Sequence, residues 1–265
     1  MRDITIGQYY AGDSVIHNLD PRTKLMGVLI FIVALFVAAN PWWYLLCLGV
    51  VLALYWTAKV PLSYLMKGLR GIVVLLVFTF FFRMVITPGT EIAQFWIFTI
   101  TEEGLARAVT LTSRIALMIT GASLLSYTST PRMLADGLEK AFSFLEKVHI
   151  PIHEMALIVM IAFRFIPIML EEMNILMDAQ AARGVEFEKC SVFRKCKNIF
   201  SVLAPLFLST VRRSADLAMA MEARGYSGEG PTARMYPLIY TKNDRIAYMC
   251  IFFFLIVMVI GRIFN

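Results

Sequence analysis

Charged side chains are scarce in this sequence: Asp, Glu, Lys and Arg make up 17% of its 265 residues, against about 25% in soluble proteins. Hydrophobic residues make up 59%, and the mean hydropathy is +0.70. An apolar excess of this size indicates contact with lipid rather than a larger core. The net charge is +6, and in a membrane protein such a basic excess marks cytoplasmic loops rather than a nucleic-acid-binding surface. We therefore expect a multi-spanning membrane protein that binds no nucleic acid.

Several chemical signatures are also missing. The sequence contains neither a G-x-x-x-x-G-K-[ST] phosphate-binding loop nor an H-E-x-x-H zinc motif, so we expect no cofactor and no catalytic role in this chain. Cys190 and Cys196 have no histidine or second cysteine pair nearby, which argues against zinc. We expect all four cysteines to be reduced and structural. Residues 1–20 lack the apolar core of a signal peptide, so the first hydrophobic segment is expected to insert by itself.

Long uncharged runs indicate the membrane segments. Leu25–Ala58 is 34 residues without a charged side chain, which is too long for one crossing of about 20 residues. Asn40-Pro41 divides it, because Pro suits the first position of a helix and Asn the cap before it. Residues 87–104 are mixed, and 95–100 could dip into the interface. The predicted fold is all-α, with five to six membrane helices; the five clear spans are 25–39, 41–58, 71–86, 105–127 and 245–263.

The distribution of Lys and Arg predicts the orientation, because cytoplasmic loops carry the excess of these residues. Basic residues precede the first span and lie between the second and third, whereas residues 40–43 and 87–104 carry none. The N-terminus and residues 128–244 are thus predicted to be cytoplasmic, and the C-terminus to lie outside. Residues 128–244 hold 14 of the 25 basic residues. This segment separates a membrane domain, residues 1–127, from a final span within residues 245–265.

Three long amphipathic helices are predicted in this cytoplasmic segment. The first begins at Thr130-Pro131 and reaches about Val148, and a turn follows at 149–151. The second covers about 152–183 and the third about 199–224, joined by a charged connection. Two apolar stretches, at 155–170 and 199–211, look like membrane spans. A crossing at the first would place the basic connection outside, so we favour helices lying along the cytoplasmic face or under the bundle.

Three arginines, Arg83, Arg107 and Arg114, fall within or near the third and fourth spans. An arginine at membrane depth is costly and often functional. Arg83 and Arg107 are expected to extend to the outer interface. Arg114 would have to reach about two turns to do so, and both a functional role and snorkelling stay open for it.

A short repeat ends the second and third predicted cytoplasmic helices. It is Ala182-Arg183-Gly184 in the second and Ala223-Arg224-Gly225 in the third. One copy is ordinary helix-end chemistry, because Gly adopts the left-handed cap and Arg suits the helix dipole. Two copies in equivalent places indicate exposed guanidinium groups that fit acidic pockets on another protein.

Methionines lie along the same two helices. A methionine stripe is either core or an adaptable docking surface, and both interpretations stay open. The residues are Met169, Met173 and Met177 on the second helix, and Met219 and Met221 on the third.

These features resemble the transmembrane (T) component of energy-coupling-factor (ECF) transporters, a branch of ABC importers. The resemblance rests on Leu19-Asp20-Pro21-Arg22-Thr23-Lys24-Leu25 before the first span, on Thr130-Pro131, and on the two Ala-Arg-Gly motifs. It covers nearly the whole chain. It implies a multi-pass protein of the cell membrane whose long cytoplasmic helices are coupling helices.

The resemblance also implies partners. Arg183 and Arg224 would each dock in a groove of one of two ABC ATPase subunits, which hold the ATP and Mg, while Ala182, Gly184, Ala223 and Gly225 shape the tips. Apolar helix faces, with the five methionines as candidate contacts, would hold a separate substrate-capture (S) protein. The cargo implied is a vitamin or a metal ion.

A self-contained secondary transporter and a membrane-embedded enzyme are the alternatives. The first predicts inverted repeats and acidic or broken helices at the membrane midplane, and the sequence shows neither. The second needs clustered carboxylates or histidines near the membrane surface. Glu171-Glu172 and Asp178 offer such carboxylates, although a solvated helix face explains them more simply.

Overall fold

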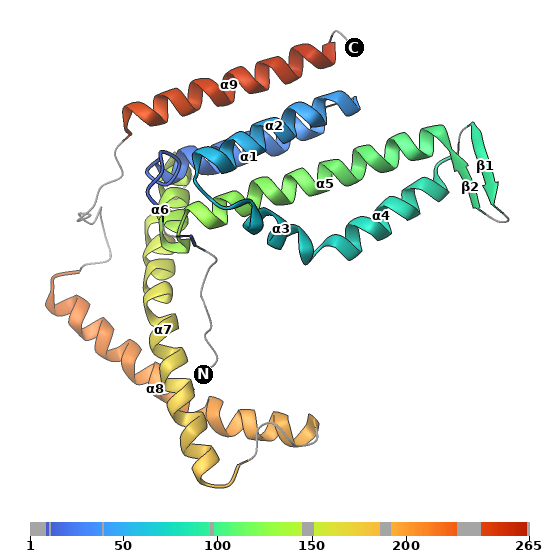
Figure 1. Cartoon of the computed structure of the whole chain (residues 1–265). Helices are drawn as coiled ribbons and strands as arrows, with labels where there is room; N and C mark the ends of the chain where they lie inside the picture. Colours follow the sequence, from blue (N-terminus) through green and yellow to red (C-terminus); the bar gives the residue numbers. More distant parts are fainter. Residues whose placement is uncertain are drawn as a thin grey trace. The chain divides into compact units, whose positions relative to one another are not determined.

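A computed structural model of the chain describes residues 9–10, 12–38, 40–88, 90–95, 98–144, 151–185, 192–226 and 240–263. Over these ranges the fold is all-α except for one short β-hairpin (Figure 1). The chain divides into two compact units. We call Met1–Ala141 with Pro237–Asn265 the bundle unit, and Phe142–Tyr236 the two-helix unit.

Each of the five predicted spans is a helix in the bundle unit. Two of them, α5 and α9, are long and apolar enough to cross a membrane alone. The short apolar helices α1 and α2 have 17 residues each, near the lower limit for a crossing of about 17–25. These helices confirm a polytopic membrane protein. Their bounds are α1 (Pro21–Val37), α2 (Pro41–Thr57), α4 (Val73–Ile86), α5 (Glu102–Thr128) and α9 (Lys242–Ile263).

Helix starts follow the residues that precede them. The Arg22 N–H donates to Asp20 Oδ1 at 2.9 Å, and Pro21 occupies the first turn of α1. Pro41 opens α2 as predicted, but the Asn40 side chain makes no capping hydrogen bond. The backbone position alone therefore sets this boundary, because Pro at the first helical position has no N–H to satisfy.

An amphipathic helix, α3 (Leu62–Arg70), precedes α4, where no helix was predicted. The two helices meet at a bend of 63° and reach a membrane-spanning length only together. Lys67 and Arg70 lie in the last turn of α3, where positive charge favours the carbonyl end of the helix. These charges therefore support a helix rather than the loop that they suggest in sequence.

A β-hairpin joins α4 to α5 instead of a simple loop. Strand β1 (Glu91–Phe95) pairs antiparallel with β2 (Phe98–Thr101), and Phe95 lies opposite Phe98. Aromatic and β-branched residues in this stretch favour strands. The expected dip of residues 95–100 into the interface falls on this hairpin and on residues 96–97, which lie outside the described part.

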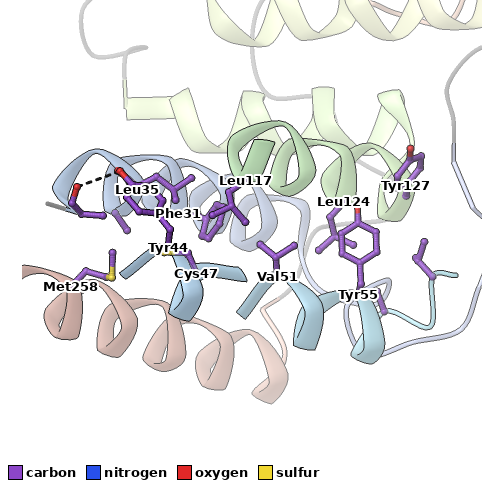
Figure 2. Close-up of a cluster of buried hydrophobic side chains, with 14 residues drawn as sticks. Phe31, Leu35, Tyr44, Cys47, Val51, Tyr55, Leu117, Leu124, Tyr127 and Met258 are labelled. Atoms are coloured by element: carbon purple, nitrogen blue, oxygen red, sulfur yellow. Dashed lines mark hydrogen bonds between the residues drawn. The ribbon is translucent and has the colours of Figure 1, made fainter. Parts of the chain in front are cut away.

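The core of the bundle unit lies where α1, α2 and α5 meet, with α9 packed against α1 (Figure 2). Leu35, Cys47 and Tyr55 are fully buried there. The Tyr55 hydroxyl donates to the Thr120 carbonyl at 3.2 Å and ties α2 to α5. The outer faces of these helices expose large apolar side chains, among them Trp56, which is 84% exposed. Such faces suit lipid.

The two-helix unit contains α7 (Ile152–Ala182) and α8 (Val192–Ala223), each with a proline inside. Helix α7 has the predicted bounds, and by length and composition alone it could also cross a membrane. Helix α8 begins seven residues before the predicted Ile199, because Arg and Lys have good intrinsic helix propensity and need not mark a loop. The residues of the predicted turn before Pro151 lie outside the described part.

The first predicted cytoplasmic helix is α6 (Pro131–Phe142), in the bundle unit except for its last residue. The Met133 N–H donates to Thr130 Oγ1 at 3.3 Å, as a capping threonine requires. Helix α6 ends at Phe142, and the predicted end near Val148 lies outside the described part of the chain.

Candidate functional site

The end of α7 is a closed helix cap. Gly184 has φ +85°, a conformation that glycine adopts with little strain. The Val185 N–H donates to the Gln180 carbonyl at 3.1 Å, and the Gly184 N–H donates to the Ala181 carbonyl at 2.9 Å. These two hydrogen bonds define a Schellman motif, which satisfies the last carbonyls of the helix.

The end of α8 has the same structure. Gly225 has φ +77°, the Tyr226 N–H donates to the Met221 carbonyl at 3.0 Å, and the Gly225 N–H donates to the Glu222 carbonyl at 2.9 Å. A side chain on either glycine would meet no atom within 4 Å. The glycines are therefore required by backbone conformation rather than by lack of space.

Both caps place an arginine at the last position before the glycine. Arg183 and Arg224 are exposed, as are the alanine and glycine on either side of each. Within the described residues neither arginine has an ion-pair partner. The sequence-predicted residues thus form two alike, exposed, cationic tips, which we call the α7 tip (182–184) and the α8 tip (223–225).

Helices α7 and α8 contact each other near the middle of their lengths (Figure 1). Arg213 Nη2 lies 3.0 Å from Glu172 Oε2, and the Ser209 hydroxyl donates to Glu172 Oε1. Beside them, Thr210 Oγ1 donates to Met169 Sδ at 3.1 Å. We call Glu172, Arg213 and Ser209 the clasp. Glu172 is therefore paired rather than solvated, a role that its neighbours in the sequence do not indicate.

The methionines divide between this contact and the surface. Met169, Met173, Met177 and Met221 are half-buried, whereas Met219 is 60% exposed. Met169 belongs to the contact with α8. Contact of these methionines with a capture protein stays a prediction.

The motif before the first span forms a buried polar network. Lys24 Nζ donates to the carbonyls of His17 and Thr128, both at 2.9 Å, and to Ser129 Oγ at 3.3 Å. A buried ammonium with three acceptors is fully satisfied. The motif therefore fastens the start of α1 to the end of α5.

Asp244 connects the same motif to the last helix. Its Oδ1 accepts from the Asp20 N–H at 2.8 Å, and its Oδ2 accepts from the Thr241 N–H at 2.8 Å. Asp244 is fully buried. It was absent from the predicted site because it looks like an ordinary polar residue before a span; its place in the first turn of α9 was the available signal.

The arginine at membrane depth is held inside the bundle. Arg114 Nη2 donates to the Tyr44 hydroxyl at 2.8 Å, and its guanidinium lies 5.2 Å from the centre of the Phe36 ring. A cation over an aromatic face is stabilised by the ring quadrupole. Arg114 therefore bonds across the bundle to α2 rather than snorkelling, whereas Arg83 and Arg107 are exposed.

Comparisons with known proteins identify the family of this chain. The CbiQ family model, described as a cobalt transport protein, matches residues 12–236. The energy-coupling factor transporter transmembrane protein EcfT of Clostridium kluyveri is 39% identical over 265 residues, covering 99% of this chain and 98% of the relative.

Two further relatives carry the same name. The protein of Lactococcus lactis subsp. cremoris is 36% identical over 261 residues, which is 98% of each chain. That of Bacillus selenitireducens is 43% identical over 233 residues, which is 86% of each chain. These relatives are named as transporter transmembrane proteins rather than enzymes. The chain is a membrane protein that belongs to the family of transmembrane (T) components of energy-coupling-factor transporters.

Proposed function

We propose that this chain couples ATP-driven closure of two ABC ATPase subunits to a separate substrate-capture membrane protein, for uptake of a vitamin or a metal ion. One observation carries the proposal: two helices end in the same rigid cap, each presenting one exposed arginine without an ion-pair partner in the described part of the chain. A guanidinium presents five donors in a fixed geometry and can form two parallel hydrogen bonds to one carboxylate. Two such tips suit two like partners.

The α7 and α8 tips would receive the movement of the ATPase subunits. ATP and Mg would be held by the ATPase subunits, whose closure would draw the α7 and α8 tips together. Because each tip continues directly into a long helix, a displacement of the tip is passed along that helix. The two helices are thus the element whose arrangement nucleotide would bias.

The apolar surface of α8 would pass this movement to the capture protein. Ile199, Leu203, Phe207 and Val211 are spaced four residues apart and are 47–71% exposed. This stripe, with the exposed Met219, supports contact with the capture protein. The metal-ion alternative for the cargo draws on the matching family description, cobalt transport protein.

The orientation belongs to the same proposal. The N-terminus and residues 128–244 would face the cytoplasm of a cell-membrane protein, since ATPase subunits work there. Helix α7 would then lie along the cytoplasmic side despite its apolar composition. Labelling of Met219→Cys and of Trp42→Cys, in a chain without its four native cysteines, tests this: a membrane-impermeant maleimide should reach position 42 but not position 219 in intact cells.

An affinity purification tests the coupling function itself. The tagged chain, expressed with its natural partners and extracted in mild detergent, should bring ABC ATPases and ATPase activity with it. Arg183→Glu with Arg224→Glu should abolish both the capture of ATPases and uptake, while the chain remains in the membrane. Lys197→Glu with Arg212→Glu changes the net charge equally at exposed positions of α8 and should leave both intact. A chain that purifies alone and still transports would refute the proposal and favour a secondary transporter; a chain that purifies alone with a chemical activity would favour an enzyme.

A further inference from the structure

Helices α7 and α8 are two copies of one pattern, offset by 41 residues. Arg183 and Arg224 differ by this number. The same offset relates Glu172 to Arg213 and Met169 to Thr210, two of the pairs that touch across the contact, while Ser209 and Glu172, which also touch, are 37 residues apart. Equivalent positions of the two copies therefore face each other, as at an isologous interface about a local two-fold axis.

Burial follows the same offset in part. From Ile158 on, the exposed positions of α7 are exposed again 41 residues later on α8, whereas several half-buried positions of α7, Met169 and Glu172 among them, correspond to exposed positions of α8. Pairs that are half-buried on both helices include Phe165 with Leu206, Ile168 with Ser209, and Leu176 with Leu217. The half-buried positions that the two helices share thus extend beyond the tips.

The ion pair of the clasp lies at the same distance from each tip along its own helix. Eleven residues separate Glu172 from Arg183, and eleven separate Arg213 from Arg224. At 1.5 Å per residue, each arm is roughly 16 Å long. Two levers of equal length therefore extend from one polar contact.

The charges at the clasp are complementary at equivalent positions. Glu171-Glu172 on α7 corresponds to Arg212-Arg213 on α8. Only the inner residue of each pair joins the contact: Glu172 and Arg213 form the ion pair, with side chains 20% and 45% exposed, whereas Glu171 and Arg212 are exposed on either side of it. The outer pair therefore offers a control with the same residue types on the same helices.

We propose that the clasp is the fulcrum on which the two coupling helices turn, an inference that rests on the proposed coupling function. A slide of one helical turn, about 5.4 Å, would break the ion pair and the Ser209 hydrogen bond together. Rotation of the helices about the contact keeps both. The clasp thus converts approach of the tips into rotation of α7 and α8 and prevents sliding, so that Glu172 and Arg213 are positioning residues for coupling.

Charge exchange tests this in the whole complex, reconstituted in proteoliposomes with its ATPases and capture protein. Glu172→Arg places two like charges at the clasp, and the substrate transported per ATP hydrolysed should fall at least about fivefold. Glu172→Arg with Arg213→Glu restores opposite charges and should recover most of the loss. Glu171→Arg, the matched control, should change little. If Glu172→Arg fails to reach the membrane, Glu172→Gln removes the charge at similar size and should also uncouple.

A distance measurement separates positioning from stability. Spin labels at Ala179→Cys and Ala220→Cys, exposed positions that also differ by 41 residues, report the separation of the arms in a chain without native cysteines. The distribution should be narrow in the parent chain, broad in Glu172→Arg and narrow again in the exchanged pair. Two results would overturn the fulcrum. One is an exchanged pair, Glu172→Arg with Arg213→Glu, that stays uncoupled and keeps a broad distance distribution. The other is a Glu171→Arg variant as impaired as Glu172→Arg.

The results that would refute the coupling function differ from those that would refute the fulcrum. Absence of ATPases from the purified parent chain, or uptake that ignores charge reversal at both tips, refutes the coupling function. The fulcrum alone is refuted if the ATPases co-purify and charge reversal at the tips abolishes uptake, but Glu172→Arg leaves the substrate transported per ATP unchanged.

Discussion

The ammonium of Lys24 lies 2.9 Å from the backbone carbonyl of Thr128, 104 residues further along the chain. The same ammonium also binds the His17 carbonyl and the Ser129 hydroxyl. One buried side chain thus links the start of α1 to the end of α5. This contact explains why a basic residue stands directly before an apolar span.

Replacement of Lys24 should destabilise the bundle without touching the tips. Lys24→Met keeps the length of the side chain but leaves three buried acceptors without a donor, so we expect a loss of about 3 kcal/mol. Thermal unfolding in detergent measures it as a lower melting temperature. Lys242→Met removes an exposed lysine near the start of α9 and should have little effect. Equal melting temperatures for both variants would contradict a stabilising role for Lys24.

Alanine at the tip glycines should strain the caps without a clash. Gly184→Ala and Gly225→Ala have open space but require positive φ, which costs an L-residue about 1–2 kcal/mol. If the caps hold the arginines for docking, ATPase capture should weaken by up to about tenfold. Gly71→Ala is the control, since Gly71 also has open space but φ −66°. Unchanged capture in the double variant would show that the arginines need no rigid cap.

Arg114 and Tyr44 should be coupled energetically. Tyr44→Phe removes the acceptor of the guanidinium and leaves a charge inside the bundle without its hydrogen bonds, so this variant should melt early. Arg114→Met in the same background removes the charge and should restore part of the stability. A double-mutant cycle of melting temperatures measures the coupling. Strictly additive effects would mean that the 2.8 Å contact contributes nothing.

Two glycines of the bundle should respond in opposite directions to alanine. A side chain at Gly261 of α9 would lie 1.9 Å from the Trp43 ring, whereas one at Gly49 of α2 would meet nothing within 4 Å. Gly261→Ala should therefore force Trp43 aside and lower the melting temperature. Gly49→Ala should raise helix stability by about 0.5–1 kcal/mol. A stabilised Gly261→Ala variant would show that α9 packs differently against α2.

Features encoded locally were predictable from the sequence. The helices at the five predicted spans, the cap at Thr130 and the two left-handed glycines each depend on a few adjacent residues, and the structure confirms them. Helix α3 was missed because its basic residues resemble a cytoplasmic loop. The early start of α8 was missed for the same reason.

Features that depend on distant residues were not predictable in the same way. Lys24, Arg114 and Glu172 each have a partner 37 or more residues away in the sequence. Nothing adjacent to Glu172 distinguishes it from the exposed Glu171. Only the 41-residue offset between the tips points to Arg213, and it does so once the two helices are known to face each other.

The hydrogen bond from the Asp20 N–H to Asp244 has a consequence for biosynthesis. During translation the first helix is made some 220 residues before the side chain that completes its N-terminal network, because Asp244 opens the last helix. Until α9 inserts, the Asp20 N–H before α1 lacks its buried acceptor, the Asp244 carboxylate. A chain truncated before α9 should therefore present quality-control proteases with an unfinished bundle, whereas the completed chain closes it in a single step at the end of synthesis.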